Sequence, residues 1–103
     1  EEETLRKAMQ FALWRLEALN KWEKDEIFNE MKTLAQVMDI KPKDFFAPLF
    51  VAISGTTASV SVFDSMAILG SDISRARMRT AVNVLGGPSK KEAKRWEKEY
   101  ADL

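Results

Sequence analysis

The chain of 103 residues contains neither cysteine nor histidine. Without cysteine it has no disulfide framework and no thiolate metal site, and without histidine it lacks the usual general base and the commonest metal ligand. Hydrolytic triads that use histidine and ordinary zinc sites are therefore excluded. No apolar run approaches the roughly 20 residues that span a bilayer, and no signal-peptide pattern is present, so we expect a soluble cytoplasmic protein without a membrane partner.

The chain also lacks an excess of either charge, since 16 basic and 16 acidic residues give a net charge of zero. Strong, indiscriminate polyanion binders are usually markedly basic, and we expect no DNA partner. The charges are uneven, because residues 1–44 carry 8 basic and 10 acidic side chains whereas residues 71–103 carry 8 basic and 5 acidic ones. Any surface that faces an anion should involve the last third of the chain.

Apolar residues recur at helical spacing through the first half of the chain. The spacing predicts helices over about residues 5–19 and 25–38, and Pro42 suits the first turn of a third that runs to Gly55. Pro48 would either kink this third helix or mark its true start. By local propensity alone, residues 49–63 instead favour a β-hairpin, with alternating β-branched residues around a four-residue turn.

Three shorter helical patterns follow, each with its own start and stop signals. The expected caps and stops are Ser61 with Asp64, Gly70, Ser71 or Asp72, Gly86-Gly87-Pro88, and Ser89 with Glu92. The last helix has only three apolar anchors. We therefore expect it to be largely exposed, with its alternating charges forming a salt-bridged solvent face.

The first helix carries a second apolar stripe that includes Phe11 and Trp14, and Trp22 follows in the next polar break. One interpretation is a broad face buried within the domain. The other is a helical protein-interaction module that docks through Phe11, Trp14 and Trp22, because a surface helix needs only one apolar face.

The stretch from residue 48 to residue 85 reads PLFVAISG, then TTASVSVFDSMAILG, then a helix with an arginine. This spacing resembles the C-terminal anticodon-binding region of bacterial-type glutamyl-tRNA synthetases, which are class I enzymes. The matching positions are Pro48, Leu49, Val51, Ala52, Gly55, Ser59, Phe63, Leu69, Gly70 and Arg77.

The resemblance implies an all-α fold, a compact bundle of about five to six short helices, and so overrules the hairpin. It implies a single anticodon-binding domain over residues 1–103, cut from a longer chain. Residues 1–40 would form a first helical pair, residues 41–87 the anticodon-facing helices and loop, and residues 88–103 the C-terminal helix.

The resemblance also implies a function: the domain would hold the anticodon loop of tRNA(Glu), for a parent that ligates glutamate to that tRNA. ATP and Mg would belong to the parent's upstream catalytic domain, since this sequence carries neither ATP-site signature of such enzymes. We therefore expect no catalytic residue, metal or cofactor here, and tRNA and the upstream domain as partners of a monomer.

The segment from Gly55 to Ser61 suits an anticodon loop, whose unstacked bases can be read individually. A solvated connector between two helices is the alternative. The candidate RNA contacts are Phe50, Thr56, Thr57, Ser59, Val60, Val62, Arg75 and Arg79, and the expected structural residues are Gly55, Gly70 and Arg77. Residues two apart on a helix point about 200° from each other, so the three arginines cannot form one patch.

Phe50 is the main departure from the family pattern, which places arginine between the leucine and the valine. An aromatic ring could replace a hydrogen bond with base stacking, worth roughly 1 to 3 kcal/mol per base. It could equally be a core residue, because it lies on the apolar stripe of its helix.

Overall fold

The computed structural model describes residues 2–54 and 62–103 of the chain. These residues form α-helices and no strand, so the all-α expectation is confirmed. The helices are α1 (Glu2–Ala18), α2 (Lys24–Val37), α3 (Pro42–Ser54), α4 (Val62–Leu69), α5 (Ser71–Val84) and α6 (Lys90–Ala101). The hairpin is wrong for the residues described, because α3 includes residues 49–54 and α4 includes residues 62 and 63.

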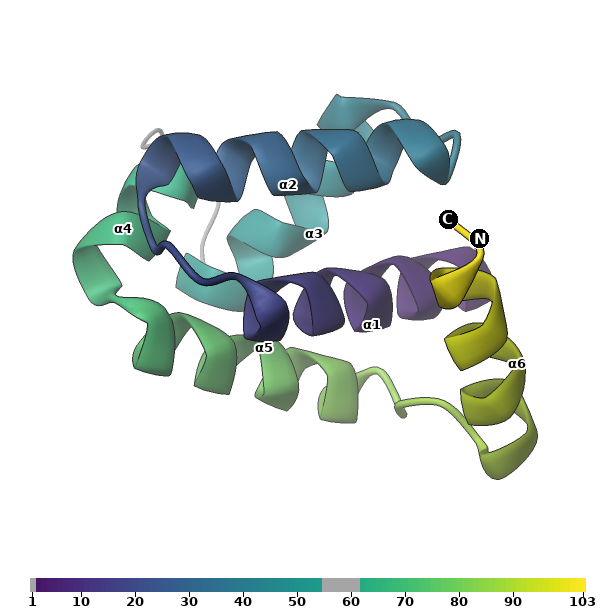
Figure 1. Ribbon diagram of the computed structural model, residues 1–103. Helices are drawn as coiled ribbons and strands as arrows, with labels where there is room; N and C mark the ends of the chain where they lie inside the picture. Colours follow the sequence, from purple (N-terminus) through teal and green to yellow (C-terminus); the bar gives the residue numbers. More distant parts are fainter. Residues whose placement is uncertain (1, 55–61) are drawn as a thin grey trace.

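Helix α1 lies at the centre of the bundle, where it packs against α2, α3 and α5 (Figure 1). Helix α4 is shorter and contacts α2, α3 and α5. The apolar stripes predicted from the sequence meet in one core, whose fully buried side chains include Phe11, Leu16, Ile27, Met31, Leu34, Leu49, Ile53, Met66, Met78 and Trp96. Amphipathic helices bury their apolar faces in this way because burial removes apolar surface from water.

The breaks between helices fall close to the predicted ones. Helix α3 begins at Pro42 and contains Pro48, so Pro48 does not mark its start. Helix α4 ends at Leu69 before Gly70, which adopts a φ of 86°, a left-handed conformation that glycine tolerates best. Gly70 itself occupies the N-cap of α5, so the expected capping by Ser71 or Asp72 is wrong.

Helix α6 packs across the N-terminal half of α1 (Figure 1). Its predicted capping box is present, since Ser89 and Glu92 exchange hydrogen bonds. Although most of the helix is exposed, the side chain of Trp96 is 0% exposed. We expected the charges of α6 to form a salt-bridged solvent face, and this expectation is wrong in one respect. The ion pairs connect α6 to α1: Glu92 pairs with Arg6, Glu99 with Lys7 and Arg95 with Glu3.

The aromatic residues of the alternative docking surface are also engaged within the domain. Phe11 is buried, and its ring lies 5.7 Å from that of Trp14. Tyr100 of α6 covers both rings at 5.2 Å. The indole of Trp22 donates to the Met66 carbonyl at 2.9 Å. The second stripe of α1 is thus an internal packing face, and the protein-interaction module is not supported.

The pair between Arg6 and Glu92 gives the domain a testable pH dependence. Both terminal nitrogens of the Arg6 guanidinium donate to the Glu92 carboxylate, at 2.9 and 2.8 Å. These bonds, with the Ser89 amide, lower the pKa of Glu92 from 4.5 to about 2. A carboxylate with a lowered folded-state pKa stabilises the fold above its unfolded pKa, and this contribution is lost as the pH falls.

We therefore expect the stability advantage of the wild type over Glu92→Gln to be constant above about pH 5 and to shrink from pH 4.5 towards pH 2. Urea unfolding followed by circular dichroism at several pH values measures this difference. Lys98→Gln is the matched control on the same helix, because no ion pair of Lys98 is present in the described part of the chain. Parallel pH curves for the wild type and Glu92→Gln would contradict the assignment.

Candidate nucleic-acid interface

Helix α3 presents two different flanks on either side of its buried stripe. Successive residues of a helix are about 100° apart, so Phe46 and Phe50 lie on one flank of the buried Leu49. Pro48 and Val51 lie on the other. The first flank faces α2 and α4, and the second faces α5.

Aromatic rings from three helices meet on the first flank. The ring of Phe63 lies 4.8 Å from Phe46 and 5.1 Å from Phe28, and Phe46 lies 5.9 Å from Phe28. Phe50 is half-buried and lies one turn after Phe46. We call these four residues the phenylalanine edge. Its rim is accessible, since 36% of Phe28 is exposed.

Two lysines of α2 lie beside the phenylalanine edge. The Lys32 Nζ is 5.9 Å from the Phe28 ring centroid, and Lys24 pairs with Asp64 of α4 at 3.0 Å. The Lys24 side chain is still 52% exposed, and exposed pairs of this kind are weak. The edge therefore combines aromatic surface with positive charge, as single-stranded nucleic-acid sites do.

Of the four residues of the phenylalanine edge, sequence reasoning singled out only Phe50 as a candidate RNA contact. Phe28, Phe46 and Phe63 each fit the apolar spacing of their own helix, and that spacing does not distinguish a buried position such as Phe63 from a partly exposed one such as Phe28. The sequence did contain a signal: each of the three helices concerned, α2, α3 and α4, has phenylalanine among its apolar residues.

Several predicted contacts lie outside the described residues. These are Thr56, Thr57, Ser59 and Val60; the expected structural residue Gly55 and Ser61 of the expected capping box also lie outside them. Val62 is the first residue of α4, and its side chain is also outside the description. In the sequence, this segment joins Ser54, the last residue of α3, to Val62, the first residue of α4.

Arg75 reaches from α5 to the C-terminal end of α1. Its Nε donates to the Leu16 carbonyl at 2.9 Å, and one terminal nitrogen donates to the Leu19 carbonyl at 3.0 Å. The guanidinium also lies 5.2 Å from the centroid of the Trp22 ring. A cation at this position satisfies terminal carbonyls and interacts favourably with the helix dipole. Arg75 thus has a structural role, and its phosphate contact stays a prediction.

The other two arginines of α5 confirm that the three do not form one patch. Arg79 pairs with Glu17 of α1 at 3.0 Å, on the same flank as Arg75. Arg77 points to the opposite flank and donates to the Ile53 carbonyl in the last turn of α3. The structure therefore does not bring Arg75 and Arg79 together with Phe50, although all were predicted to contact RNA.

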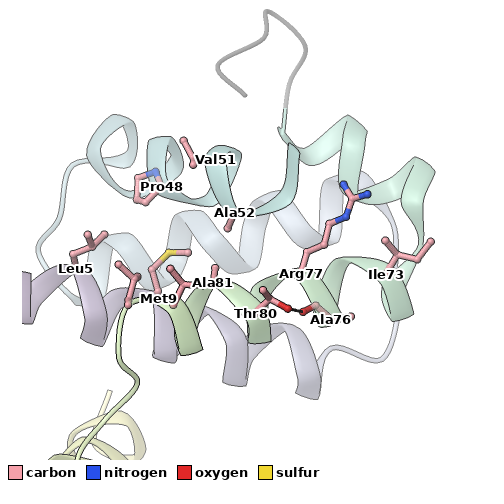
Figure 2. A pocket seen from close by; sticks show the side chains of 12 residues that line it. Leu5, Met9, Pro48, Val51, Ala52, Ile73, Ala76, Arg77, Thr80 and Ala81 are labelled. Atoms are coloured by element: carbon pink, nitrogen blue, oxygen red, sulfur yellow. Dashed lines mark hydrogen bonds between the residues drawn. The ribbon is translucent and has the colours of Figure 1, made fainter. Parts of the chain in front are cut away.

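The second flank of α3 borders an open apolar groove of about 750 Å³ between α3 and α5, with α1 at one end (Figure 2). Thr80 and Arg77 are the polar members of its described lining, and the Thr80 hydroxyl donates to the Ala76 carbonyl at 3.1 Å. The lining residues are Leu5, Met9, Pro48, Val51, Ala52, Ile73, Ala76, Arg77, Thr80, Ala81, Val84 and Leu85. The groove offers contact surface and little hydrogen bonding.

Residues 2–54 and 62–103 contain no group of three acidic side chains that could hold a metal ion. None of the helices in the same ranges is long and apolar enough to cross a membrane.

Comparisons with known proteins agree on one family. The model of the family described as "Anticodon binding domain" matches residues 1–82. The glutamate–tRNA ligase of Marinomonas sp. (strain MWYL1) is 97% identical over all 103 residues, which are 21% of its length. The ligase of Saccharophagus degradans is 61% identical over 98% of this chain and 20% of its own length. The chain therefore spans about a fifth of the length of the curated relatives it matches.

Proposed function

Because the chain belongs to the anticodon binding domain family, we propose that it holds the anticodon loop of a tRNA against the phenylalanine edge and residues 55–61. The observation that carries this proposal is the edge itself, a partly exposed aromatic surface with Lys24 and Lys32 beside it. Anticodon bases are unstacked and can pack on aromatic rings, each contact contributing roughly 1 to 3 kcal/mol.

Within this proposal the residues divide by chemistry. Hydroxyl groups at Thr56, Thr57 and Ser59 would bond to base edges, and Val60 and Val62 would pack against a base face. Arg79 is a secondary phosphate contact, because its ion pair with Glu17 is exposed and can open. Arg75 would contact RNA only through the N–H groups that do not donate to the Leu16 and Leu19 carbonyls. Phosphate contacts of this kind position the RNA and carry no sequence information.

We further propose that the parent protein is a glutamate–tRNA ligase, on the strength of the relatives' names and their 53 to 97% identity over the matched residues. The ligase would use ATP and Mg in a catalytic domain outside this chain, act in the cytoplasm as a monomer, and charge tRNA(Glu). Holding the anticodon loop at the edge would position the acceptor end of the tRNA in the distant active site. No step of ligation falls to the residues of this chain.

Restoring the family arginine gives a direct test of the edge. We expect Phe50→Arg to tighten binding of an anticodon stem-loop and to steepen the log–log salt dependence of the affinity by about 0.7, which corresponds to one added contact with single-stranded phosphate. Fluorescence anisotropy with a labelled stem-loop at several salt concentrations measures both.

Val84→Arg is the matched control, because it adds the same charge at an 81% exposed position on α5, away from the edge. It should change the affinity much less than Phe50→Arg does. Equal gains from the two variants would mean that any added charge suffices, and would contradict recognition at the phenylalanine edge.

A further inference from the structure

The groove between α3 and α5 is a second surface, separate from the phenylalanine edge. It lies on the flank of α3 opposite Phe50. Three of the most exposed large apolar side chains of the described residues border it: Val51 is 51% exposed, Ile73 47% and Val84 81%. Figure 2 shows Val51 and Ile73 at the groove. Apolar side chains gathered in this way on a small domain mark an interaction site more often than a solvent face.

The chemistry of the groove argues against RNA as its occupant. Arg77 is the one charged residue of its described lining, and this guanidinium donates to the Ile53 carbonyl. A nucleic-acid site needs several cations to neutralise phosphates. The groove instead fits aliphatic or aromatic side chains, which need shape and water exclusion.

We propose that the groove is covered by polypeptide that precedes residue 1 in a full-length ligase. The relatives carry about four fifths of their length outside the stretch that this chain matches. Helix α1 begins at Glu2, and Leu5 in its first turns lines one end of the groove, as Figure 2 shows. Glu2, the first described residue, is one helical turn from Leu5, so polypeptide upstream of α1 needs no long connection to reach the groove.

This docking would fix the direction of the phenylalanine edge relative to the rest of the enzyme. The groove and the phenylalanine edge lie on opposite flanks of α3. Polypeptide bound in the groove would therefore also fix the orientation of the edge. Arg77 would hold α5 and α3 together in this arrangement, because its guanidinium donates a hydrogen bond to the Ile53 carbonyl at the end of α3, at the border of the groove. The inference rests on the proposed parent but not on RNA binding.

Hydroxyl-radical footprinting tests the docking. The isolated chain and a full-length ligase that contains this sequence would be labelled under the same conditions. We expect labelling of Val51, Ile73 and Val84 to fall at least fivefold in the full-length enzyme. Ile68 is the internal control, because it is 84% exposed on α4 and lies outside the groove lining. Equal labelling of the groove in both proteins, or an equal fall at Ile68, would overturn the proposal.

A charge substitution tests the contact itself. Val84→Lys should leave the circular dichroism and melting temperature of the isolated chain unchanged, because the side chain is exposed. In the full-length enzyme it should restore at least half of the labelling of Val51 and Ile73, whereas Ile68→Lys should restore none. Failure of Val84→Lys to restore labelling would overturn the contact.

Two other occupants give different results in the isolated chain. A second copy would make groove labelling fall as the concentration of the isolated chain rises, with a dimer in sedimentation. RNA would make it fall on addition of an anticodon stem-loop. Either result overturns the proposal. Loss of stem-loop binding with groove protection intact would instead count against the proposed function alone.

Discussion

Replacing Trp96 by alanine is expected to destabilise the domain by roughly 3 to 5 kcal/mol, the range for large-to-small substitutions of fully buried aromatic residues. The side chain is 0% exposed and is the largest in the core. Its ring also lies 5.5 Å from the Arg6 guanidinium, which pairs with Glu92. For a domain of this size the melting temperature should fall by roughly 15 °C or more, as calorimetry would measure.

Two variants of α6 separate this effect from helix propensity. Lys94→Ala, at an exposed position, should change stability by no more than about 0.5 kcal/mol. Trp96→Phe should cost less than Trp96→Ala, because it keeps a ring and removes a buried indole N–H that has no hydrogen-bond partner among the described residues. A Trp96→Ala domain as stable as the wild type would show that α6 does not dock on α1.

Replacing Arg75 by alanine should cost roughly 2 to 3 kcal/mol, because hydrogen bonds to charged groups contribute more than neutral ones. The substitution removes the Arg75 donors from the Leu16 and Leu19 carbonyls at the end of α1 and, among the described residues, leaves the Leu16 carbonyl with only the longer bond from the Leu19 amide, at 3.4 Å. It also removes the contact with Trp22. Urea unfolding measures the free energy, and binding of a stem-loop to the folded variant measures any RNA contribution.

Arg75→Lys distinguishes a structural arginine from a phosphate contact. Lysine keeps the charge but not the planar fork that reaches two carbonyls. A structural role predicts that Arg75→Lys loses most of the stability that Arg75→Ala loses, while the salt dependence of RNA binding stays unchanged. A phosphate contact predicts a stable Arg75→Lys domain, and a salt slope for Arg75→Ala that is shallower by about 0.7.

The positions of the helices could be predicted from the sequence because each depends on local information. The second helix was expected over residues 25–38 and runs over Lys24–Val37. Its apolar period and the proline and glycine breaks are properties of neighbouring residues. The hairpin expectation arose in the same way, because β-branched alternation over residues 49–63 is also a local signal, and tertiary packing of α3 and α4 prevailed over it.

Contacts between distant segments could not be predicted. The alternating charges of α6 are typical of a solvent-exposed helix. Glu92 pairs with Arg6, and Trp96 is buried, only because α6 packs against α1 in the folded domain. Helix geometry correctly separated Arg77 from Arg75 and Arg79. It did not show which flank faces α1. The phenylalanine edge likewise depends on three helices meeting.

Backbone amide chemical shifts during titration with an anticodon stem-loop at low salt test recognition at the phenylalanine edge most directly. The account predicts that the largest shifts fall on Phe28, on residues 46–62 and on Phe63, with α6 unmoved. A stem-loop of the same length with a closed, fully paired loop should bind more weakly, since it offers no unstacked bases. A folded domain whose amides stay unmoved, or shift only along the groove between α3 and α5, would contradict it.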